Sequence, residues 1–359
     1  MTPPLQTSCE DSLQPSCEDS VHGNDGDEQF ANINWDELEF WLTPTDYMYS
    51  MKCVKGDNFS QGNLIPFGNI ELSPSAGGLF EGLKAYRKED GHIQLFRPAE
   101  NALRLKMGAE RMCMPSPTVE QFIHAVKQTV LANKRWVPPT GKGALYLRPL
   151  LIGSGAILGL APAPEYTFLV YASPVGNYHK GQEALDLLVE DKINRATRGG
   201  TGGVKSITNY APVFLAQARA KAKGFADVIF LDSKSGKYIE EVSACNIFIV
   251  KGKVISTPAI EQGTVLPGVT RKSIMEIAIT YGYKVEERRI RVKDLLRADE
   301  AFCTGTAVVV IPIGSVEYHG RSVIYKTGNE TVCQALYETL VGIQTGRIEE
   351  EMGWTVEVC

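Results

Sequence analysis

The chain has 359 residues, of which 43% are hydrophobic and 22% are charged, and its formal net charge at pH 7 is −5. This composition is ordinary for a soluble globular protein of one or two domains, and the negative charge gives no general attraction to nucleic acid or to an anionic membrane. The eight cysteines include no C-x-x-C pair, and no apolar run approaches the roughly 18 residues of a membrane span, so we expect no zinc site, no disulfide framework and no transmembrane helix.

Residues 1–31 differ in composition from the rest of the chain. Up to Phe30 they contain seven acidic residues and no Lys or Arg, and they repeat the segment SCEDS. A segment this polar and charged is typical of disordered chain. It also lacks the apolar stretch of a secretory signal and the arginines of an organellar transit peptide. We therefore expect a disordered acidic tail on a cytoplasmic protein, with the chloroplast as the alternative location.

Residues 32–172 read as a first, smaller domain. Helical spacing predicts helices over 98–112 and 119–136, the second of which ends before Pro138. The segments HIQLFR, ALYLRPLLIG and EYTFLVYAS are rich in β-branched and aromatic residues and predict strands. The polar, glycine-containing stretch that follows, 173–184, is the predicted linker to a second domain.

Residues 185–359 read as a larger second domain. ALDLLVE and ADVIFLD predict strands, and NIFIVKGKVIST predicts a hairpin with a two-residue Gly-Lys turn. Helices are predicted over 210–223, closed by Gly224, and over 270–281 and 330–346. Because helices and strands mix without strict alternation, the pattern favours an α+β fold over a doubly wound parallel sheet.

The segment RGGTGGVKSITNY, residues 198–210, raises the question of what Lys205 does. Residues 199–206 resemble the phosphate-binding loop of nucleotide hydrolases, G-x-x-x-x-G-K-[ST]. Val204 argues against that function, because it stands where the second glycine lets the backbone approach a phosphate. The preceding residues EDKINRAT are also polar rather than a buried strand. A lysine amine could instead bond a cofactor aldehyde if burial or a nearby cation lowered its pKa, although most lysines lie on the surface.

Other segments contain groups that such a cofactor needs. Glu241 stands immediately before an apolar strand, where a carboxylate is paired either with a pyridinium nitrogen or with a local Arg or Lys. The predicted helix start at 268–270 offers free backbone N–H groups to a phosphate. Thr306 adds a hydroxyl, and Arg104 adds a cation unless it only faces solvent.

Taken in order and spacing, these segments resemble the branched-chain amino-acid aminotransferases, in particular the plant members, which are pyridoxal-phosphate enzymes of fold type IV. The resemblance covers roughly residues 32–358. It implies a smaller N-terminal α/β domain, a linker and a larger, β-rich C-terminal domain that carries the reactive lysine. The matching segments are FEGLKAYR, LFRPAENALRLKMGAERMCMP, GKGALYLRPLLIGSG, GTGGVKSITNY, EEVSACNIF, LPGVTRKSI and CTGTAVVV.

The resemblance also implies the roles of individual residues. Lys205 would bond the aldehyde of pyridoxal 5′-phosphate and carry the Cα proton, Glu241 would pair with the ring nitrogen, and Tyr210 would contact the phenolic oxygen. Leu266 would pack on the ring. The phosphate would be bound by Arg104, Gly268, Val269, Thr270 and Thr306. Substrate α-carboxylates would contact Thr306 and Ala307. Tyr146 and Arg148 would bind the dicarboxylate partner, and Phe40, Phe80 and Tyr210 would line an apolar side-chain pocket.

The function implied is transamination between leucine, isoleucine or valine and 2-oxoglutarate, which yields glutamate, by a homodimer. Two alternatives remain open. In SPSAGGLFEGL, the turn before Phe80 is about six residues shorter than in relatives, which implies a catalytically impaired variant as one alternative. The other is a different fold type IV enzyme, either a D-amino-acid aminotransferase or an aminodeoxychorismate lyase.

Overall fold

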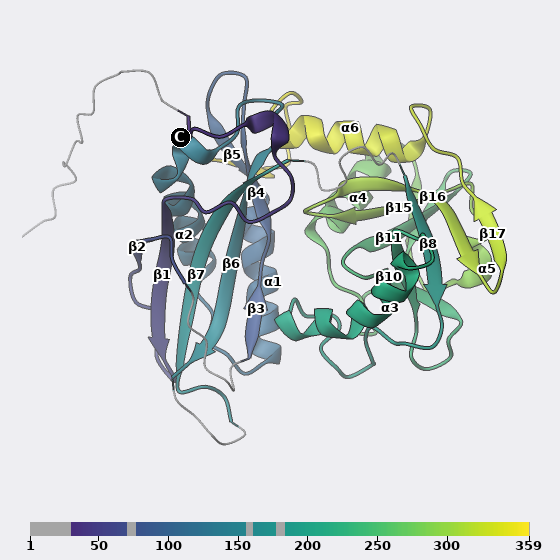
Figure 1. Cartoon of the computed structure of the whole chain (residues 1–359), viewed down its shortest axis with the longest axis horizontal. Coiled ribbons are helices and arrows are strands. Elements are labelled where there is room, and N and C mark those ends of the chain that lie inside the picture. The colour runs from purple at the N-terminus through teal and green to yellow at the C-terminus, as the bar shows by residue number, and fades with distance from the viewer. Residues whose placement is uncertain (1–29, 70–76, 156–160, 177–183, 359) are drawn as a thin grey trace, which may run out of the picture.

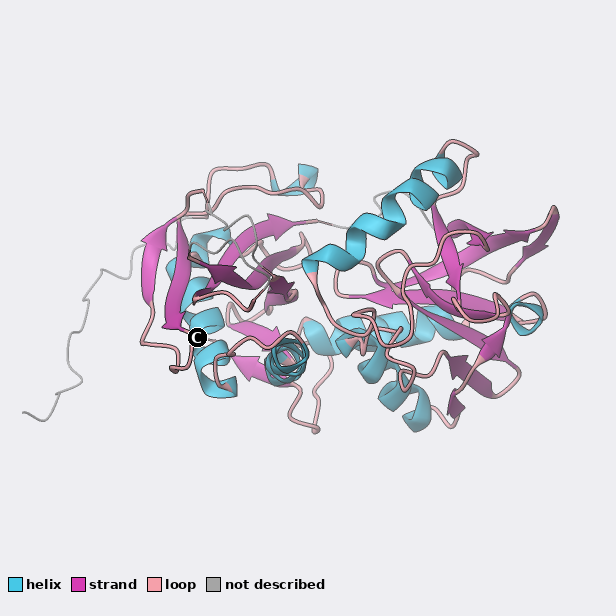
Figure 2. Cartoon of the chain, turned by 90° about the horizontal axis from the view of Figure 1, so that it is seen from below, coloured by secondary structure: helices cyan, strands magenta, loops and turns pink. Residues whose placement is uncertain are grey.

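The computed structural model describes residues 30–69, 77–155, 161–176 and 184–358, which form two lobes built on separate β-sheets (Figure 1). Figure 2 shows the same two lobes from a second direction, each with its own group of strands. Helices and strands are mixed in both lobes, as the predicted α+β fold requires.

The first lobe contains an eight-stranded antiparallel sheet in the order β18-β5-β4-β6-β7-β1-β2, with β3 paired to β6. Helices α1 (Pro98–Arg111) and α2 (Val119–Ala132) pack on this sheet. The strands are β1 (Tyr47–Val54), β2 (Asn63–Pro66), β3 (Gly78–Phe80), β4 (Leu83–Arg87), β5 (Ile93–Phe96), β6 (Ala144–Ser154), β7 (Glu165–Val175) and β18 (Thr355–Glu357).

Helix α2 illustrates how local sequence sets the ends of an element. It begins at a capping box, in which the Thr118 hydroxyl accepts from the Gln121 N–H and the Gln121 side chain accepts from the Thr118 N–H. The helix buries Phe122 and Val126 against the sheet. It ends at Ala132, earlier than the predicted Trp136, because residues 134–136 form a separate 3₁₀ turn after Asn133, whose side-chain amide donates to the carbonyls of Thr129 and Tyr47.

The second lobe contains a ten-stranded mixed sheet in the order β13-β12-β11-β15-β16-β8-β9-β10-β14, with β17 paired to β16. The pairs β8–β9, β8–β16 and β12–β13 are parallel and the others antiparallel. Helices α4 and α6 share a buried apolar cluster with β11 and β15, and α3 packs on β9. The strands are β8 (Leu185–Glu190), β9 (Asp227–Leu231), β10 (Tyr238–Val242), β11 (Asn246–Lys251), β12 (Val254–Thr257), β13 (Lys284–Glu287), β14 (Ile290–Arg291), β15 (Glu300–Gly305), β16 (Val309–Tyr318) and β17 (Arg321–Ile324); the helices are α3 (Ala211–Lys221), α4 (Val269–Thr280), α5 (Val292–Leu295) and α6 (Val332–Gln344).

Several predicted elements are confirmed with small shifts at their ends. The hairpin of β11 and β12 turns through Gly252 and Lys253, with Lys251 opposite Val254, and Gly252 has the positive φ of 55° that a tight turn favours. Helix α3 starts one residue later than predicted, after a 3₁₀ turn at Ile207–Tyr210.

Three predicted boundaries differ in the structure. Phe30 and Ala31 belong to the folded body rather than to the tail, since Ala31 is buried and its N–H donates to the Arg135 carbonyl. Residues 173–175 of the predicted linker continue β7, which stays paired to β6 through Val175, and 177–183 lie outside the described residues. Strand β18 returns from the end of the second half to pair with β5, so the last strand belongs to the first sheet.

The described residues were searched for membrane-spanning helices and for metal-binding groups. None of their helices is long and apolar enough to cross a membrane. No group of three or more His, Cys, Asp or Glu side chains among them could hold a metal ion.

Candidate active site

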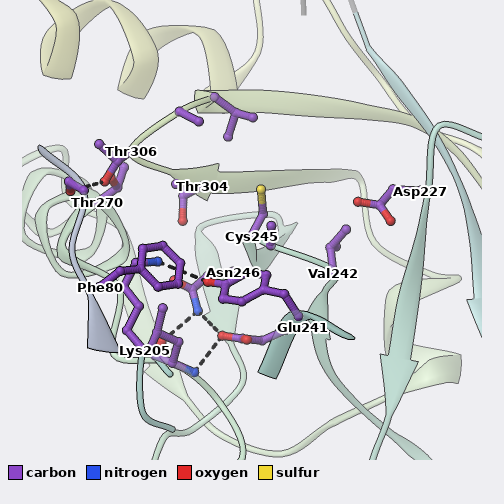
Figure 3. A pocket seen from close by; sticks show the side chains of 18 of the residues that line it. Phe80, Lys205, Asp227, Glu241, Val242, Cys245, Asn246, Thr270, Thr304 and Thr306 are labelled. Carbon is purple, nitrogen blue, oxygen red and sulfur yellow. Dashed lines mark hydrogen bonds between the residues drawn. The ribbon is translucent and has the colours of Figure 1, made fainter. Parts of the chain in front are cut away.

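A cavity of about 550 Å³ lies between the two lobes and is lined by side chains from both (Figure 3). The first lobe contributes residues of β3, β6 and α1, and the second contributes the lysine loop, β10, the start of α4 and the turn after β15. The structure brings every predicted site residue to this cavity: Phe40, Phe80, Arg104, Tyr146, Arg148, Lys205, Tyr210, Glu241, Leu266, Gly268, Val269, Thr270, Thr306 and Ala307.

Lys205 lies in a loop that is fixed to both lobes. Its carbonyl accepts from the Phe80 N–H at 3.1 Å, so the loop extends the edge of β3. The Asn209 side-chain amide ties the loop together by donating to the carbonyls of Thr201 and Val204 at 2.6 and 2.7 Å. A loop held in this way presents the amine in one place.

The surroundings of Lys205 favour its neutral form. Burial, followed by the nearby charges of Arg104 and Arg148, lowers the pKa of Lys205 to about 7, while Glu81 and Glu241 oppose the shift. Its Nζ donates to the Tyr210 hydroxyl at 3.2 Å and lies 4.4 Å from the centre of the Phe80 ring. A large fraction of this amine is therefore unprotonated near neutral pH and able to act as a nucleophile or base.

Glu241 lies inside β10, not before a strand as predicted, and its carboxylate is buried. One oxygen accepts from the Asn246 amide at 2.6 Å and from the Leu266 N–H at 2.7 Å, and the other from Arg195 at 2.7 Å. Burial raises the pKa of Glu241 to about 7, and the charge of Arg195 opposes the rise. The structure shows the local arginine partner and also places Glu241 at the wall of the cavity. Pairing with a protonated ring nitrogen, the other predicted partner, stays a prediction.

Helix α4 begins at the predicted position and borders the cavity, so that its first N–H groups could bind a phosphate there. Its N-cap is Gly268, which has no side chain to cap the first helical N–H groups. A Cβ at Gly268 would lie 2.1 Å from the Asn246 Oδ1, so only glycine fits between this helix start and the Glu241 network. An anion-binding helix start, a reactive amine and a carboxylate in one cavity fit the phosphate, aldehyde and ring nitrogen of pyridoxal 5′-phosphate.

Arg104 reaches this site through partners that the sequence did not indicate. Its Nε and Nη2 donate to the two oxygens of Glu81 at 2.8 and 2.7 Å, and its Nη1 donates to the Pro267 carbonyl at 3.2 Å. The guanidinium therefore does not face solvent. Exposure to solvent was the alternative that would have excluded Arg104 from the site.

The turn after β15 is held from the first lobe. Thr306 Oγ1 donates to the Gly82 carbonyl at 3.1 Å, and the buried Lys84 donates to the Ala307 carbonyl at 3.1 Å. Burial lowers the pKa of Lys84 to about 8. These bonds join the two lobes at the place where a substrate α-carboxylate is expected.

Aromatic rings and one arginine form the opposite wall. Phe40 and Tyr146 meet edge to face at 5.2 Å, and the Arg148 guanidinium lies 4.7 Å from the Phe80 ring centre. Arg148 donates to the Tyr146 hydroxyl at 3.1 Å, and its Nε has no hydrogen-bond partner among the described residues. The wall thus combines apolar surface with a cation. The shortened turn before Phe80 falls at 70–76, outside the described residues.

Sequence reasoning missed two residues that line the cavity, Arg195 and Asn246, and two that bond its lining residues, Glu81 and Lys84. Three of them carried a readable signal. Glu81 and Lys84 flank the pair Gly82-Leu83 in an otherwise apolar strand pattern, and Asn246 stands five residues after Glu241. Arg195 carried none, since it stands in a polar loop where arginines usually face solvent.

Comparison with known proteins shows the family to which this chain belongs. The amino-transferase class IV family matches residues 78–316. The chloroplastic branched-chain amino acid aminotransferase 2 of Humulus lupulus is 64% identical over 92% of this chain and 83% of its own, and the chloroplastic branched-chain-amino-acid aminotransferase 2 of Arabidopsis thaliana is 62% identical over 93% and 87%.

Solved structures give the same result for the fold. The branched-chain aminotransferase of the archaeon Thermoproteus uzoniensis, solved with norvaline, has a TM-score of 0.72 and 28% identity, covering 86% of this chain and 99% of its own. The two-domain α+β fold is therefore that of the fold type IV aminotransferases. With a family match over most of the chain and relatives above 60% identity, this chain belongs to the class IV aminotransferases, in the branched-chain group of the plant type.

Proposed function

We propose that this protein transfers the amino group of leucine, isoleucine or valine to 2-oxoglutarate, with pyridoxal 5′-phosphate bonded to Lys205. One observation carries the proposal: the Lys205 amine, with a pKa lowered to about 7, lies in one cavity with the Glu241 carboxylate and the free N–H groups of α4. This arrangement supports the proposal, because the cofactor's aldehyde, ring nitrogen and phosphate each need one of these groups.

When bound, pyridoxal 5′-phosphate accepts the electron pair that the substrate Cα–H bond leaves behind. The chain provides the groups around that step. Glu241 holds a proton on the ring nitrogen, and its hydrogen bonds from Asn246 and the Leu266 N–H keep the carboxylate in place. Lys205 would remove the Cα proton and return it at C4′ of the cofactor, because an amine with a pKa near neutral pH serves as both base and acid. The Tyr210 hydroxyl, which lies beside the Lys205 amine, would donate to the cofactor's phenolic oxygen.

The wall that combines apolar surface with a cation explains how one pocket can accept two kinds of side chain. Phe40, Phe80 and Tyr146 provide apolar contact for the branched side chains. The side-chain carboxylate of 2-oxoglutarate or glutamate would pair with Arg148, whose Nε is unpartnered among the described residues. The turn at Thr306 and Ala307 would bind the α-carboxylate of both.

Two further properties complete the proposal. We infer a homodimer, on the resemblance to the family, and sedimentation of the active protein tests it. Both plant relatives are chloroplastic, which favours the chloroplast over the cytoplasm that the acidic tail suggested. A fluorescent fusion of the full-length chain in plant cells separates these two locations.

The proposed activity is tested by incubating the purified protein with leucine and 2-oxoglutarate and measuring glutamate. The proposal expects turnover with L-leucine and none with D-leucine or aminodeoxychorismate. Turnover of D-amino acids or release of pyruvate from aminodeoxychorismate would support the other fold type IV functions. A protein that binds the cofactor but forms glutamate at only a trace rate would support the impaired variant.

A further inference from the structure

Glu81 is a fully buried carboxylate immediately after β3, at the edge of the cavity. It accepts four hydrogen bonds: from Arg104 Nε at 2.8 Å, Arg104 Nη2 at 2.7 Å, the Asn101 amide at 2.7 Å and the Gly82 N–H at 3.3 Å. A buried carboxylate is stable only when its charge is compensated in this way. Its chain neighbours Phe80 and Gly82 and its partner Arg104 all line the cavity, so Glu81 can affect what binds there.

The contact between Glu81 and Arg104 is bidentate, and it fixes the direction of the guanidinium. Two parallel N–H···O bonds hold the Nε and Nη2 edge of the group, which leaves the Nη1 end pointing at the Pro267 carbonyl, one residue before the N-cap of α4. An amide at position 81 could not replace this contact, because it has one acceptor oxygen and one NH₂ donor. The Glu81 carboxylate is therefore what aims Arg104 at the start of α4.

The backbone around Glu81 connects this pair to the reactive lysine. The Glu81 N–H donates to the Pro149 carbonyl at 2.8 Å, and the preceding N–H, of Phe80, donates to the Lys205 carbonyl at 3.1 Å. Both charges also act on the Lys205 amine, with Arg104 lowering its pKa and Glu81 raising it.

We propose that Glu81 is a positioning residue, which holds the Arg104 guanidinium at the N-terminus of α4 so that it binds the phosphate of the cofactor. The proposal rests on the proposed function, which places pyridoxal 5′-phosphate in this cavity. A positioning role and a purely electrostatic role of Glu81 predict opposite changes in phosphate affinity when the carboxylate is removed. If Glu81 acted only as a negative charge, its removal would strengthen phosphate binding; if it positions Arg104, its removal weakens phosphate binding although the site becomes more positive.

The experiment compares two ligands of the cofactor-depleted protein. Pyridoxal 5′-phosphate and pyridoxal have the same ring and aldehyde, so the ratio of their affinities isolates the phosphate contact. Glu81→Gln should reduce this ratio about tenfold or more, the scale of one lost hydrogen bond to a charged group. The matched control is Glu300→Gln. Glu300 is also buried and accepts two backbone N–H bonds, from Val332 and Cys333, but these partners do not line the cavity, whereas Arg104 does.

Two further variants test whether Glu81 acts through Arg104. Arg104→Lys keeps the charge but cannot form the bidentate contact with Glu81, so it should also reduce the affinity ratio. Adding Glu81→Gln to Arg104→Lys should then have little further effect. The pH at which half of Lys205 reacts with an amine reagent should fall in Glu81→Gln and stay unchanged in Glu300→Gln. Should Glu81→Gln not fold, Asn101→Ala removes another ligand of the same carboxylate and should give a smaller drop in the same ratio.

The outcomes separate the positioning role from the proposed cofactor. An unchanged or increased ratio in Glu81→Gln, or full additivity with Arg104→Lys, would overturn the positioning role and leave the cofactor assignment intact. Equal affinity of the parental protein for the two ligands would overturn both, because no phosphate contact would then exist for Arg104 to make.

Discussion

Lys205 and Tyr210, five residues apart in the chain, meet in the cavity, where the lysine Nζ donates to the phenolic oxygen at 3.2 Å. The 3₁₀ turn at Ile207–Tyr210 brings the ring back toward the lysine. Burial raises the pKa of Tyr210 to about 12, opposite to the shift of Lys205. At neutral pH the site therefore places a protonated phenol beside an amine that exists in both its neutral and its protonated form, as proton transfer at this nitrogen needs.

The first prediction concerns the reactivity of Lys205 with pH. In the cofactor-depleted protein, half of Lys205 should react with an amine reagent near pH 7, because only the neutral amine reacts and its pKa is lowered to about 7. Arg104→Met should move this midpoint upward, since Arg104 lowers the pKa. Mass spectrometry of the peptide that contains Lys205 measures both midpoints. A midpoint near that of an exposed lysine in the parental protein would refute the lowered pKa.

The second prediction concerns Glu241. Glu241→Gln should still bind the cofactor, because the phosphate site is separate, but should slow Cα deprotonation by at least tenfold, since an amide does not hold a proton on the ring nitrogen and about 1.4 kcal/mol of barrier is already a factor of ten. Single-turnover spectra with leucine measure the step. Glu240→Gln is the matched control, as Glu240 is buried in the same strand but does not line the cavity. Equal rates in the two variants would make Glu241 structural.

The third prediction separates the two substrates. Arg148→Met keeps apolar volume and removes the cation, so the KM for 2-oxoglutarate should rise on the order of 10- to 100-fold, the value of a hydrogen bond to a charged group. The KM for leucine should change much less, because its side chain has no charge to pair. Steady-state kinetics with each substrate varied in turn gives both values. Equal effects on both would place Arg148 outside the side-chain pocket.

The fourth prediction uses the close contact at Gly82. A Cβ there would lie 2.0 Å from the Tyr146 hydroxyl, so Gly82→Ala must displace the tyrosine and with it the hydrogen bond from Arg148. Misplacing substrate by about 1 Å costs on the order of 100-fold in rate. Gly68→Ala serves as control, because the nearest atom to its added Cβ is 3.9 Å away. Near-parental turnover in Gly82→Ala would show that Tyr146 does not set the substrate position.

Elements with strong local patterns could be predicted from the sequence. The periodic apolar residues of α1, the Gly-Lys hairpin of β11 and β12 and the glycine-started α4 were all predicted within a few residues. The pairing of β18 with β5 could not be predicted, because register between segments so far apart depends on tertiary packing and not on any local signal. The same holds for the extension of β7 into a polar, glycine-containing stretch, where pairing with β6 overrides the turn signal.

Among the site residues, too, those with a local sequence signal could be predicted and those placed by tertiary packing could not. Lys205, Glu241 and the 268–270 helix start occupy recognisable segments, and the structure brings them together. The partners that orient them, such as Arg195 for Glu241 and Glu81 for Arg104, come from segments remote in the chain. A side chain's partner in a distant segment has no signature in either segment alone.

The central claim is that Lys205 is the residue that bonds the cofactor. Treating the yellow holoenzyme with borohydride fixes that bond, and peptide mass spectrometry then locates the attached group. We predict loss of the visible band and a single adduct, on Lys205, with neither band nor adduct in Lys205→Ala. An adduct on another lysine, or an undiminished band and leucine turnover in Lys205→Ala, would contradict the account.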